Sequence, residues 1–438
     1  MKVLKFGGTS LGNAARMQSV ANIVTQNQPV LVVLSAVSGT TNELISIVES
    51  IKEAKISDAI DTVESLNEHY SHYIKELYSS ELIKSKANKF LQAQFSDLIK
   101  LIHSQFEASF EYQILAKGEL ISTELFHLYL IEQEEKASLI QALDFLRLTQ
   151  EGMPDEIFLE KQLSNLISQN TDQKLYITQG FICRNAFGDT SNLNRGGSDY
   201  SASLFGAAIN CEEIQIWTDI DGMHNNDPRY ICNTQPVPQL SFDEAAELAY
   251  FGAKILHPSS IKPARKKNIP VRLLNTLEPS ASGTLICRDT VPSTIKAVAA
   301  KSGITAINIR SSDMLQAPGF LRRIFEVFEL YQTSIDMVTT SEVAVSVTID
   351  NLKNQDAIVK TLNEFGHVEV DNNLSIVSVV GERLIERSEL IALVINSLNG
   401  ISIRMISYGG SAHNISFLVP ENSKLNALKA LHQGIFDV

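Results

Sequence analysis

The chain has 438 residues, a formal net charge of −13 and a hydrophobic fraction of 44%. This length predicts roughly two to four domains, because a single hydrophobic core rarely grows beyond about 250–300 residues. The negative charge argues against sequence-independent binding of nucleic acid, which requires a basic surface, but it is compatible with a local basic pocket for an anionic substrate.

The chain shows no sign of export or membrane insertion. The N-terminus lacks the long apolar region of a secretory signal, and the apolar stretch 30–34 is far too short for a membrane span. The cysteines are widely separated and predict reduced thiols rather than a disulfide scaffold or a zinc site: Cys183, Cys211, Cys232 and Cys287. We therefore expect a cytoplasmic protein.

The first part of the chain alternates strands with helices. Residues 2–6 form an apolar run that ends at a Gly-Gly turn, and apolar residues then recur at helical spacing from 17 to 24. Residues 30–36 predict a second buried strand, followed by a helix through 44–51. This order predicts an α/β fold with a mostly parallel sheet between helices.

A helical section interrupts this alternation. Residues 40–117 contain neither glycine nor proline, and apolar residues recur at intervals of three and four, which predicts a helical insertion over about 55–112. Strands return near 174–182, 213–217 and 269–274. We assign residues 1–290 to this first domain.

The last part of the chain repeats one pattern. Residues 303–373 are predicted as strand, helix, two strands, helix and a short strand, and residues 374–438 repeat that order. Two α+β units of the split βαβ type explain the match better than two unrelated small domains. Residues 295–301 predict another strand, which could belong to the second unit.

Two glycine-rich segments carry the strongest chemical signals. In KFGGTS, Gly7 and Gly8 allow close approach of the backbone to a phosphate, and Lys5 can neutralise its charge. This segment is neither a Walker loop nor a dinucleotide fingerprint. In RGGSDYSA, the guanidinium of Arg195 suits bidentate binding of a carboxylate. Taken alone, a turn like KFGGTS is more often plain structure, whereas RGGSDYSA is equally compatible with an ordinary turn near a helix start.

Three further segments are weaker. WTDIDG and DPR place acidic and turn residues after a buried strand, where open α/β sheets bind ligands. Glu119 opens a predicted helix in KGELIS, and Lys254 lies in GAKILHP. The alternatives are ordinary turns for the first pair, a helix-dipole partner for Glu119 and a solvated side chain for Lys254.

Taken together and in order, these segments resemble the aspartate kinases of the amino-acid kinase family, and the last part resembles their tandem ACT regulatory domains. The resemblance covers essentially the whole chain, and we expect no fused homoserine dehydrogenase. It implies transfer of the γ-phosphoryl group of ATP, with Mg²⁺, to the side-chain carboxylate of L-aspartate, giving 4-phospho-L-aspartate, the first step toward lysine, threonine and methionine.

The resemblance also implies residue roles. The catalytic residues would be Lys5, Arg195 and Glu119, and the aspartate-binding residues would be Thr41, Glu119, Arg195 and Ser198. The ATP-binding residues would be Lys5, Gly7, Gly8, Ser10, Thr218, Asp219, His224, Arg229 and Lys254. His224 stands where the family usually has tyrosine, which would alter the contact with the adenine ring. No protein side chain is assigned as a metal ligand.

The ACT region implies regulation. The residues that resemble the lysine site of lysine-inhibited aspartate kinases are Met314, Gly319, Phe320, Leu321, Ser334, Ile335, Asp336, Thr340, Ser341 and Glu342. We therefore expect L-lysine as a feedback inhibitor and a homodimer or tetramer formed through the ACT domains. Nucleic acid and membrane partners are not expected.

Two alternatives remain open at this point. Another amino-acid kinase, acting on glutamate or acetylglutamate, shares a glycine-rich start but is not expected to combine RGGSDY with two ACT units. A non-catalytic amino-acid sensor on a dead kinase fold would be favoured by loss of Lys5 or Arg195, and both are present.

Overall fold

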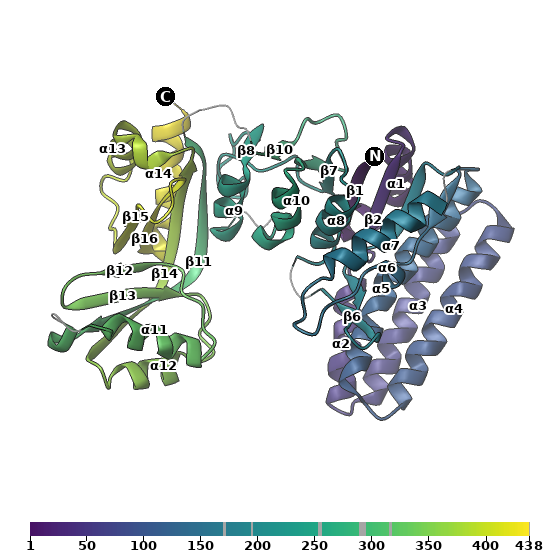
Figure 1. Ribbon diagram of the computed structural model, residues 1–438, viewed down its shortest axis with the longest axis horizontal. Coiled ribbons are helices and arrows are strands. Elements are labelled where there is room, and N and C mark those ends of the chain that lie inside the picture. Colours follow the sequence, from purple (N-terminus) through teal and green to yellow (C-terminus); the bar gives the residue numbers. More distant parts are fainter. Residues whose placement is uncertain (170–171, 194–195, 253–255, 289–294, 315–317, 438) are drawn as a thin grey trace. The chain divides into compact units, whose positions relative to one another are not determined.

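The computed structural model describes residues 1–169, 172–193, 196–252, 256–288, 295–314 and 318–437 (Figure 1). The chain forms two compact units. Unit 1 comprises Met1–Met223, Pro238–Phe242 and Leu256–Thr290, and unit 2 comprises His224–Val237, Asp243–Ile255 and Val291–Val438. Across the described ranges, no helix is both long and apolar enough to cross a membrane.

Unit 1 is built on an eight-stranded sheet with the strand order β3-β4-β2-β1-β7-β9-β10-β8. Neighbouring strands are parallel except for the antiparallel pair β9–β10. The strands are β1 (Lys2–Phe6), β2 (Val30–Leu34), β3 (Ala137–Leu139), β4 (Leu175–Gln179), β7 (Ile214–Thr218), β8 (Gln239–Ser241), β9 (Val271–Asn275) and β10 (Thr284–Cys287). Every residue of β2 and β4 is buried, which explains why β2 is a continuous apolar run rather than an alternating pattern.

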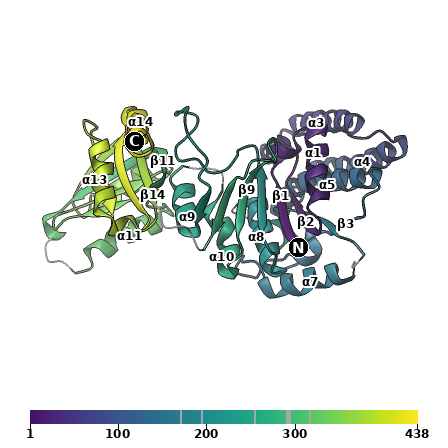
Figure 2. The same cartoon turned by 90° about the horizontal axis from the view of Figure 1, so that it is seen from above.

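Helices cover both faces of this sheet. Figure 2 shows α8 and α10 on one side of the strands and α1 and α5 on the other. Helix α1 begins after Asn13, whose side chain accepts a hydrogen bond from the backbone N–H of Arg16. The remaining elements of unit 1 are η1 (Gly8–Leu11), α1 (Ala14–Gln26), α6 (Ala142–Phe145), α7 (Glu156–Gln169), β5 (Ile182–Arg184), β6 (Thr190–Asn192), α8 (Gly197–Ala208), η2 (Pro258–Ile261) and α10 (Lys262–Lys267).

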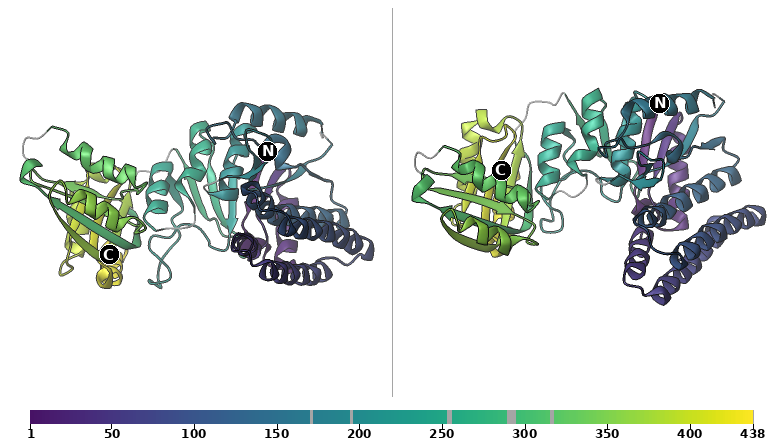
Figure 3. Two further views of the ribbon diagram at one scale, coloured as in Figure 1. Left: turned by 90° about the horizontal axis from the view of Figure 1, so that it is seen from below. Right: turned by 60° about the horizontal axis from the view of Figure 1, so that its bottom comes forward.

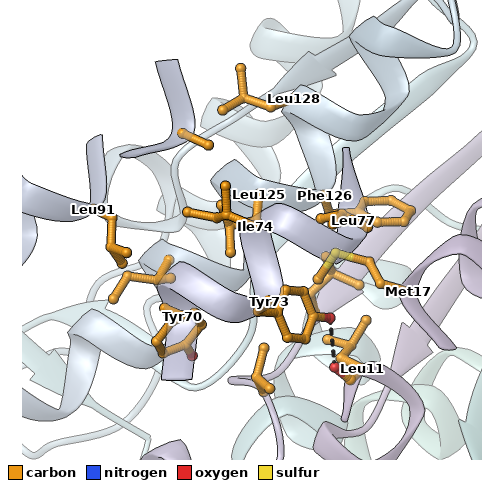
Figure 4. Close-up of a cluster of buried hydrophobic side chains, with 14 of the residues drawn as sticks. Leu11, Met17, Tyr70, Tyr73, Ile74, Leu77, Leu91, Leu125, Phe126 and Leu128 are labelled. Atoms are coloured by element: carbon orange, nitrogen blue, oxygen red, sulfur yellow. Dashed lines mark hydrogen bonds between the residues drawn. The ribbon is translucent and has the colours of Figure 1, made fainter. Parts of the chain in front are cut away.

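The predicted helical section forms a bundle of α2 (Thr40–Lys52), α3 (Ile56–Leu77), α4 (Glu81–His103) and α5 (Ala108–Glu132). Helices α3 and α4 are long rods that extend away from the sheet (Figure 3). Their apolar faces share one core with α1 and β1, and Figure 4 shows Tyr73 within it, with its hydroxyl donating to the carbonyl of Leu11 at 2.8 Å. The bundle and the sheet are therefore one packed body.

Unit 2 contains a six-stranded antiparallel sheet with the order β12-β13-β11-β14-β16-β15. Its strands are β11 (Ile295–Arg310), β12 (Val338–Thr340), β13 (Ala344–Ile349), β14 (His367–Gly381), β15 (Met405–Tyr408) and β16 (Asn414–Pro420). Its helices are α9 (Phe242–Tyr250, of which Phe242 falls in unit 1), η3 (Ser312–Met314), α11 (Phe320–Leu330), α12 (Gln355–Leu362), η4 (Leu384–Glu386), α13 (Ser388–Ser397), η5 (Glu421–Ser423) and α14 (Lys424–Phe436).

Two long strands connect the halves of this sheet. The register between β11 and β14 shifts near Lys301 and Ile304, so residues 295–301 pair with 376–381 while residues 304–310 pair with 367–374. The first set packs into a core with α13 and α14, and the second into a core with α11 and α12.

The structure differs from the sequence prediction in three places. A short strand before residue 373 and a new strand from 374 were expected, but β14 is continuous across that position. The strand expected over 334–340 begins only at Val338. The helix expected directly after the first glycine turn is preceded by a 3-10 turn and begins at Ala14, because Asn13 provides its cap.

Candidate active site

The candidate site lies at the carboxyl edge of the parallel strands of unit 1. Strands β4, β2, β1 and β7 are consecutive neighbours, so their carboxyl ends meet at one edge. The residues that follow them are Gly180, Ser35, Gly7 and Asp219. Ligands of open α/β sheets bind at this edge, and two of the sequence motifs, KFGGTS and WTDIDG, lie there.

The Gly-Gly turn after β1 fits tightly against the segment after β2. A Cβ atom on Gly8 would lie 2.9 Å from the carbonyl oxygen of Ala36, and the N–H of Ser38 donates to the carbonyl of Gly8 at 3.1 Å. Ser10 is buried, and its hydroxyl shares a 2.7 Å hydrogen bond with Thr276. Within this motif, the half-buried Gly7 and Gly8 are therefore the residues placed for backbone contact with a ligand.

Lys5 places its ammonium group over this turn. A Cβ on Gly7 would lie 3.5 Å from Lys5 Nζ, an ordinary contact distance, so the ammonium group lies directly beside this glycine. Lys5 Nζ lies 2.7 Å from Asp199 Oδ1, and the two side chains are 11% and 17% exposed. Asp199 belongs to the first turn of α8. This partly buried ion pair fixes the direction of the Lys5 charge.

Glu119 is enclosed on the inward face of α5. Its Oε1 accepts a 3.2 Å hydrogen bond from the N–H of Ala36, and among the described residues its Oε2 has no hydrogen-bond partner. Burial raises the pKa of Glu119 to about 8, although the Ala36 N–H and the Lys5 charge act in the opposite direction. A carboxyl group with an unused buried oxygen is suited to receive a cationic group of a ligand.

Ser198 approaches the same edge. Its hydroxyl accepts a 2.9 Å hydrogen bond from Ser35, and Gly180 makes the approach possible because a Cβ there would lie 2.4 Å from Ser198 Cβ. Thr41, in the first turn of α2, is half-buried, and the preceding Thr40 shares a 2.7 Å hydrogen bond with Tyr70 of α3. The helical insertion thus holds the turn that carries Thr41.

The other predicted residues fall into three groups. Arg195 and Lys254 lie outside the described residues. Thr218 is the last residue of β7 and Asp219 follows it at the same edge, and the Thr218 hydroxyl donates to Asp219 Oδ1 at 3.1 Å. His224 and Arg229 belong to unit 2. There, His224 Nδ1 lies 2.8 Å from the Thr234 hydroxyl, and Arg229 forms an ion pair with Asp227.

The predicted effector residues lie in unit 2. Gly319 has a φ of +86° and precedes α11, with open space where a Cβ would be, and Leu321 is exposed. Phe320 is buried in the core of this half and partly buried Met314 and Ile335 pack against that core, so these three residues contribute packing. The exposed members are Ser334, Thr340, Ser341 and Glu342. The Asp336 side chain is almost completely buried and contacts Lys301 and Tyr250.

Three charged or polar partners were not predicted from the sequence. Asp199 lies in the RGGSDYSA segment but was given no role, and its position directly after Ser198 was the available signal. Lys301 and Tyr250 carried no motif, and only the fold places them at Asp336. Across the residues that the structure describes, no group of three or more His, Cys, Asp or Glu side chains is arranged to hold a metal ion.

Comparison with known proteins agrees with this architecture. A model of the amino acid kinase family matches residues 1–275, and an ACT domain model matches residues 307–365 and 377–435. The chain is 34% identical to aspartokinase 3, chloroplastic, of Arabidopsis thaliana, over 99% of this chain and 81% of that protein. It is 32% identical to the lysine-sensitive aspartokinase 3 of Escherichia coli K12, over 99% of both.

Solved structures show the same likeness. The structure of E. coli aspartokinase III in complex with aspartate and ADP, in the R-state, has a TM-score of 0.85 and 32% identity, with 100% of both chains covered. The complex of that enzyme with lysine and aspartate, in the T-state, has a TM-score of 0.82 and 31% identity, with 100% of this chain and 99% of that chain covered. This chain belongs to the amino acid kinase family and, within it, to the aspartokinases, phosphotransferases that act on aspartate.

Proposed function

We propose that this aspartokinase transfers the γ-phosphoryl group of ATP to the side-chain carboxylate of L-aspartate at the carboxyl edge of the unit 1 sheet. The observation that carries the proposal is the position of the Lys5 ammonium, over Gly7 and paired with Asp199. The Lys5 charge also acts on the buried carboxyl group of Glu119. One cation thus lies between a backbone turn suited to phosphates and a carboxyl group suited to an amino acid.

Glu119 would bind the α-ammonium of aspartate through its unused Oε2, which is buried and pairs with nothing else among the described residues. Arg195 would bind the α-carboxylate with its two-pronged guanidinium. Thr41 and Ser198 would complete the pocket through their hydroxyl groups. The side-chain carboxylate of the substrate is then the group left to face the nucleotide.

The nucleotide would place its phosphates at Gly7 and Gly8, with Lys5 and Ser10 on the same turn. Thr218, the last residue of β7, and Asp219, which follows it, are the proposed contacts to the remainder of ATP. Mg²⁺ would enter with the triphosphate, since this ion prefers phosphate and water oxygens and is often held by few protein groups. Bound in this way, it supplies positive charge to the phosphate oxygens.

The chemistry requires positioning and charge neutralisation rather than a general base. A carboxylate titrates near ~4 and is already an anion at pH 7. Its oxygen attacks the γ-phosphorus in line, the bond to the β-γ bridging oxygen breaks, and ADP leaves. Lys5 offsets the repulsion between the carboxylate and the triphosphate, and Asp199 keeps Lys5 directed at the turn.

We also propose that L-lysine inhibits this enzyme through the ACT region and that two or more copies associate there. The name of the E. coli relative describes it as lysine-sensitive, and its structure has been solved with lysine. In this chain, the supporting observation is Asp336, whose buried Oδ2 has no hydrogen-bond partner among the described residues. A buried carboxylate oxygen of this kind is suited to an ammonium group.

Trapping the product as a hydroxamate tests the proposal directly. Wild-type enzyme with ATP, Mg²⁺ and aspartate should yield aspartyl hydroxamate, whereas glutamate should not, and added lysine should reduce the yield. Inhibition by threonine but not by lysine would refute the effector assignment. Hydroxamate formation from glutamate in preference to aspartate would refute the assigned acceptor pocket.

A further inference from the structure

The carboxylate of Asp336 lies at the centre of a cluster within unit 2. Its Oδ1 accepts hydrogen bonds from the Tyr250 hydroxyl at 2.7 Å and from Lys301 Nζ at 2.8 Å. Lys301 Nζ also lies 2.9 Å from Asp350 Oδ2 and 4.6 Å from the centre of the Tyr250 ring. The Asp336 side chain is only 1% exposed.

The groups around Lys301 are those that recognise any primary ammonium. Two carboxylates supply charge-assisted hydrogen bonds, and the aromatic ring supplies a cation–π contact. Burial disfavours the charge of Lys301, but the hydrogen bonds and charges of Asp336 and Asp350 outweigh it, and the pKa of Lys301 lies above its ordinary value. The side chain therefore remains a cation in this cluster.

A free amino-acid effector would present the same kind of group to the same carboxylate. An effector ammonium at Oδ2, which has no partner among the described residues, would lie beside the Lys301 ammonium at Oδ1, and two cations on one buried carboxylate repel each other. Asp350 is 40% exposed and lies at the outer side of the cluster. It provides a position that can hold the Lys301 ammonium when that group leaves Asp336.

We propose that Lys301 is a tethered cation that neutralises the Asp336 carboxylate from Oδ1, so that an amino-acid effector binds at Oδ2 only by displacing it. The inference rests on the proposed binding of lysine at Asp336 and adds the residue that sets its affinity. Lys301 lowers the sensitivity of the enzyme to its effector, because the competent form of the site is populated only when the tether has moved away.

Displacement of Lys301 would change the contacts of α9, a helix within the region matched by the amino acid kinase family. The Tyr250 side chain loses its cation contact, while Gly252 lies so close to β11 that a Cβ there would be 2.1 Å from the carbonyl oxygen of Ala300. The exchange of ammonium groups therefore takes place directly beside α9.

Calorimetric titration of the full-length enzyme with lysine tests the proposal. The Lys301→Met variant should bind lysine about tenfold more tightly than wild type, as expected if the tether leaves the site free about one-tenth of the time. Lys301→Arg keeps the cation and should bind like wild type. Arg310→Gln removes an exposed cation at the far end of the same strand and serves as the matched control.

Asp350→Asn provides a second route that leaves Lys301 and Asp336 in place. It removes one of the two carboxylates that pair with Lys301. If lysine must displace Lys301 in order to bind, lysine affinity should rise several-fold in this variant. This variant keeps the proposal testable if Lys301→Met does not fold.

The outcomes separate the two proposals. One outcome would contradict the displacement of Lys301 but support lysine binding at Asp336. It is equal lysine affinity in wild type, Lys301→Met and Asp350→Asn, together with loss of binding in Asp336→Asn. Absence of lysine binding in wild type and in all of these variants would overturn the effector site itself. Tighter binding in both Lys301→Met and Asp350→Asn is the result that supports the tether.

Discussion

Lys5 Nζ lies 2.7 Å from Asp199 Oδ1, and this ion pair joins the carboxyl end of β1 to the first turn of α8. Residues from the two glycine-rich motifs thus meet although 194 positions separate them in sequence, as counted from 5 to 199. Both side chains are largely buried, so solvent screens the pair less than a surface ion pair. We regard Asp199 as the residue that positions the Lys5 charge.

Substitutions of Lys5 and Asp199 should distinguish the effect of the Lys5 charge on catalysis from the effect of its position. Lys5→Met removes the cation that neutralises the triphosphate, and kcat should fall about 10²–10³-fold, the loss typical of one electrostatic donor. Asp199→Asn keeps the Lys5 cation but removes the charged partner that orients it, and kcat should fall by up to about 10²-fold. Steady-state kinetics check both effects. Unchanged kcat in Lys5→Met would show that this cation does not act in the reaction.

Proton release should accompany aspartate binding. With a pKa of about 8, Glu119 is mostly protonated at pH 7, and pairing with the substrate ammonium requires its carboxylate form. Most of one proton should be released per aspartate at pH 7 and little at pH 9, and affinity should rise with pH between these values. Calorimetry in two buffers of different ionisation enthalpy measures this release.

The control for this experiment is Glu124→Gln, on the same helix, which should leave proton release unchanged; Glu119→Gln should abolish it. Release that persists in Glu119→Gln would assign the proton to another group.

The same carboxyl group should make the stability of the ligand-free enzyme depend on pH. The folded-state pKa of about 8 lies above the ordinary value of 4.5, so the folded state binds more protons than the unfolded state between these values. The free energy of unfolding therefore falls as pH rises from 4.5 to about 8. Denaturant titration of wild type and Glu119→Gln at pH 5.5 and 7.5 measures this fall in the free energy of unfolding. A decline equally steep in Glu119→Gln would exclude Glu119 as its source.

Gly180 should be required for the position of Ser198. An alanine Cβ would lie 2.4 Å from Ser198 Cβ and 2.8 Å from Ser198 Cα, so the start of α8 must shift. Gly180→Ala should destabilise the fold by about 1–3 kcal/mol and lower kcat/KM for aspartate about 10–100-fold. Gly410→Ala, where no atom lies within 4 Å of the new Cβ, is the control and should change neither quantity.

Tyr70 should link the helical insertion to the aspartate pocket. Tyr70→Phe removes the partner of the buried Thr40 hydroxyl, next to Thr41, and should cost about 1–3 kcal/mol of stability. Tyr78→Phe removes an equally buried hydrogen bond, to the carbonyl of Leu125 at 2.7 Å. Both variants should lose stability in chemical denaturation, but only Tyr70→Phe should raise KM for aspartate. An equal KM in the two variants would exclude this link.

Parts of the site follow from local sequence. Lys5, Gly7 and Gly8 stand at the end of an apolar run, and such a run followed by glycines predicts both the strand and the turn. The helical insertion likewise follows from a long segment without glycine or proline. By contrast, the sequence predicted a break between two strands at residues 373 and 374, whereas β14 continues across this position. Its two ends pair with different parts of β11, and such long-range pairing cannot be predicted from local sequence.

The sequence by itself determined the type of most elements and placed two motifs, KFGGTS and WTDIDG, at the ends of buried strands, since periodicity and glycine act over a few residues. Only the tertiary structure decided that Asp199 faces Lys5, that Lys301 forms an ion pair with Asp336, and that Glu119 is enclosed enough to raise its pKa. These features depend on strand order and on burial, which are properties of segments brought together from distant positions in the chain.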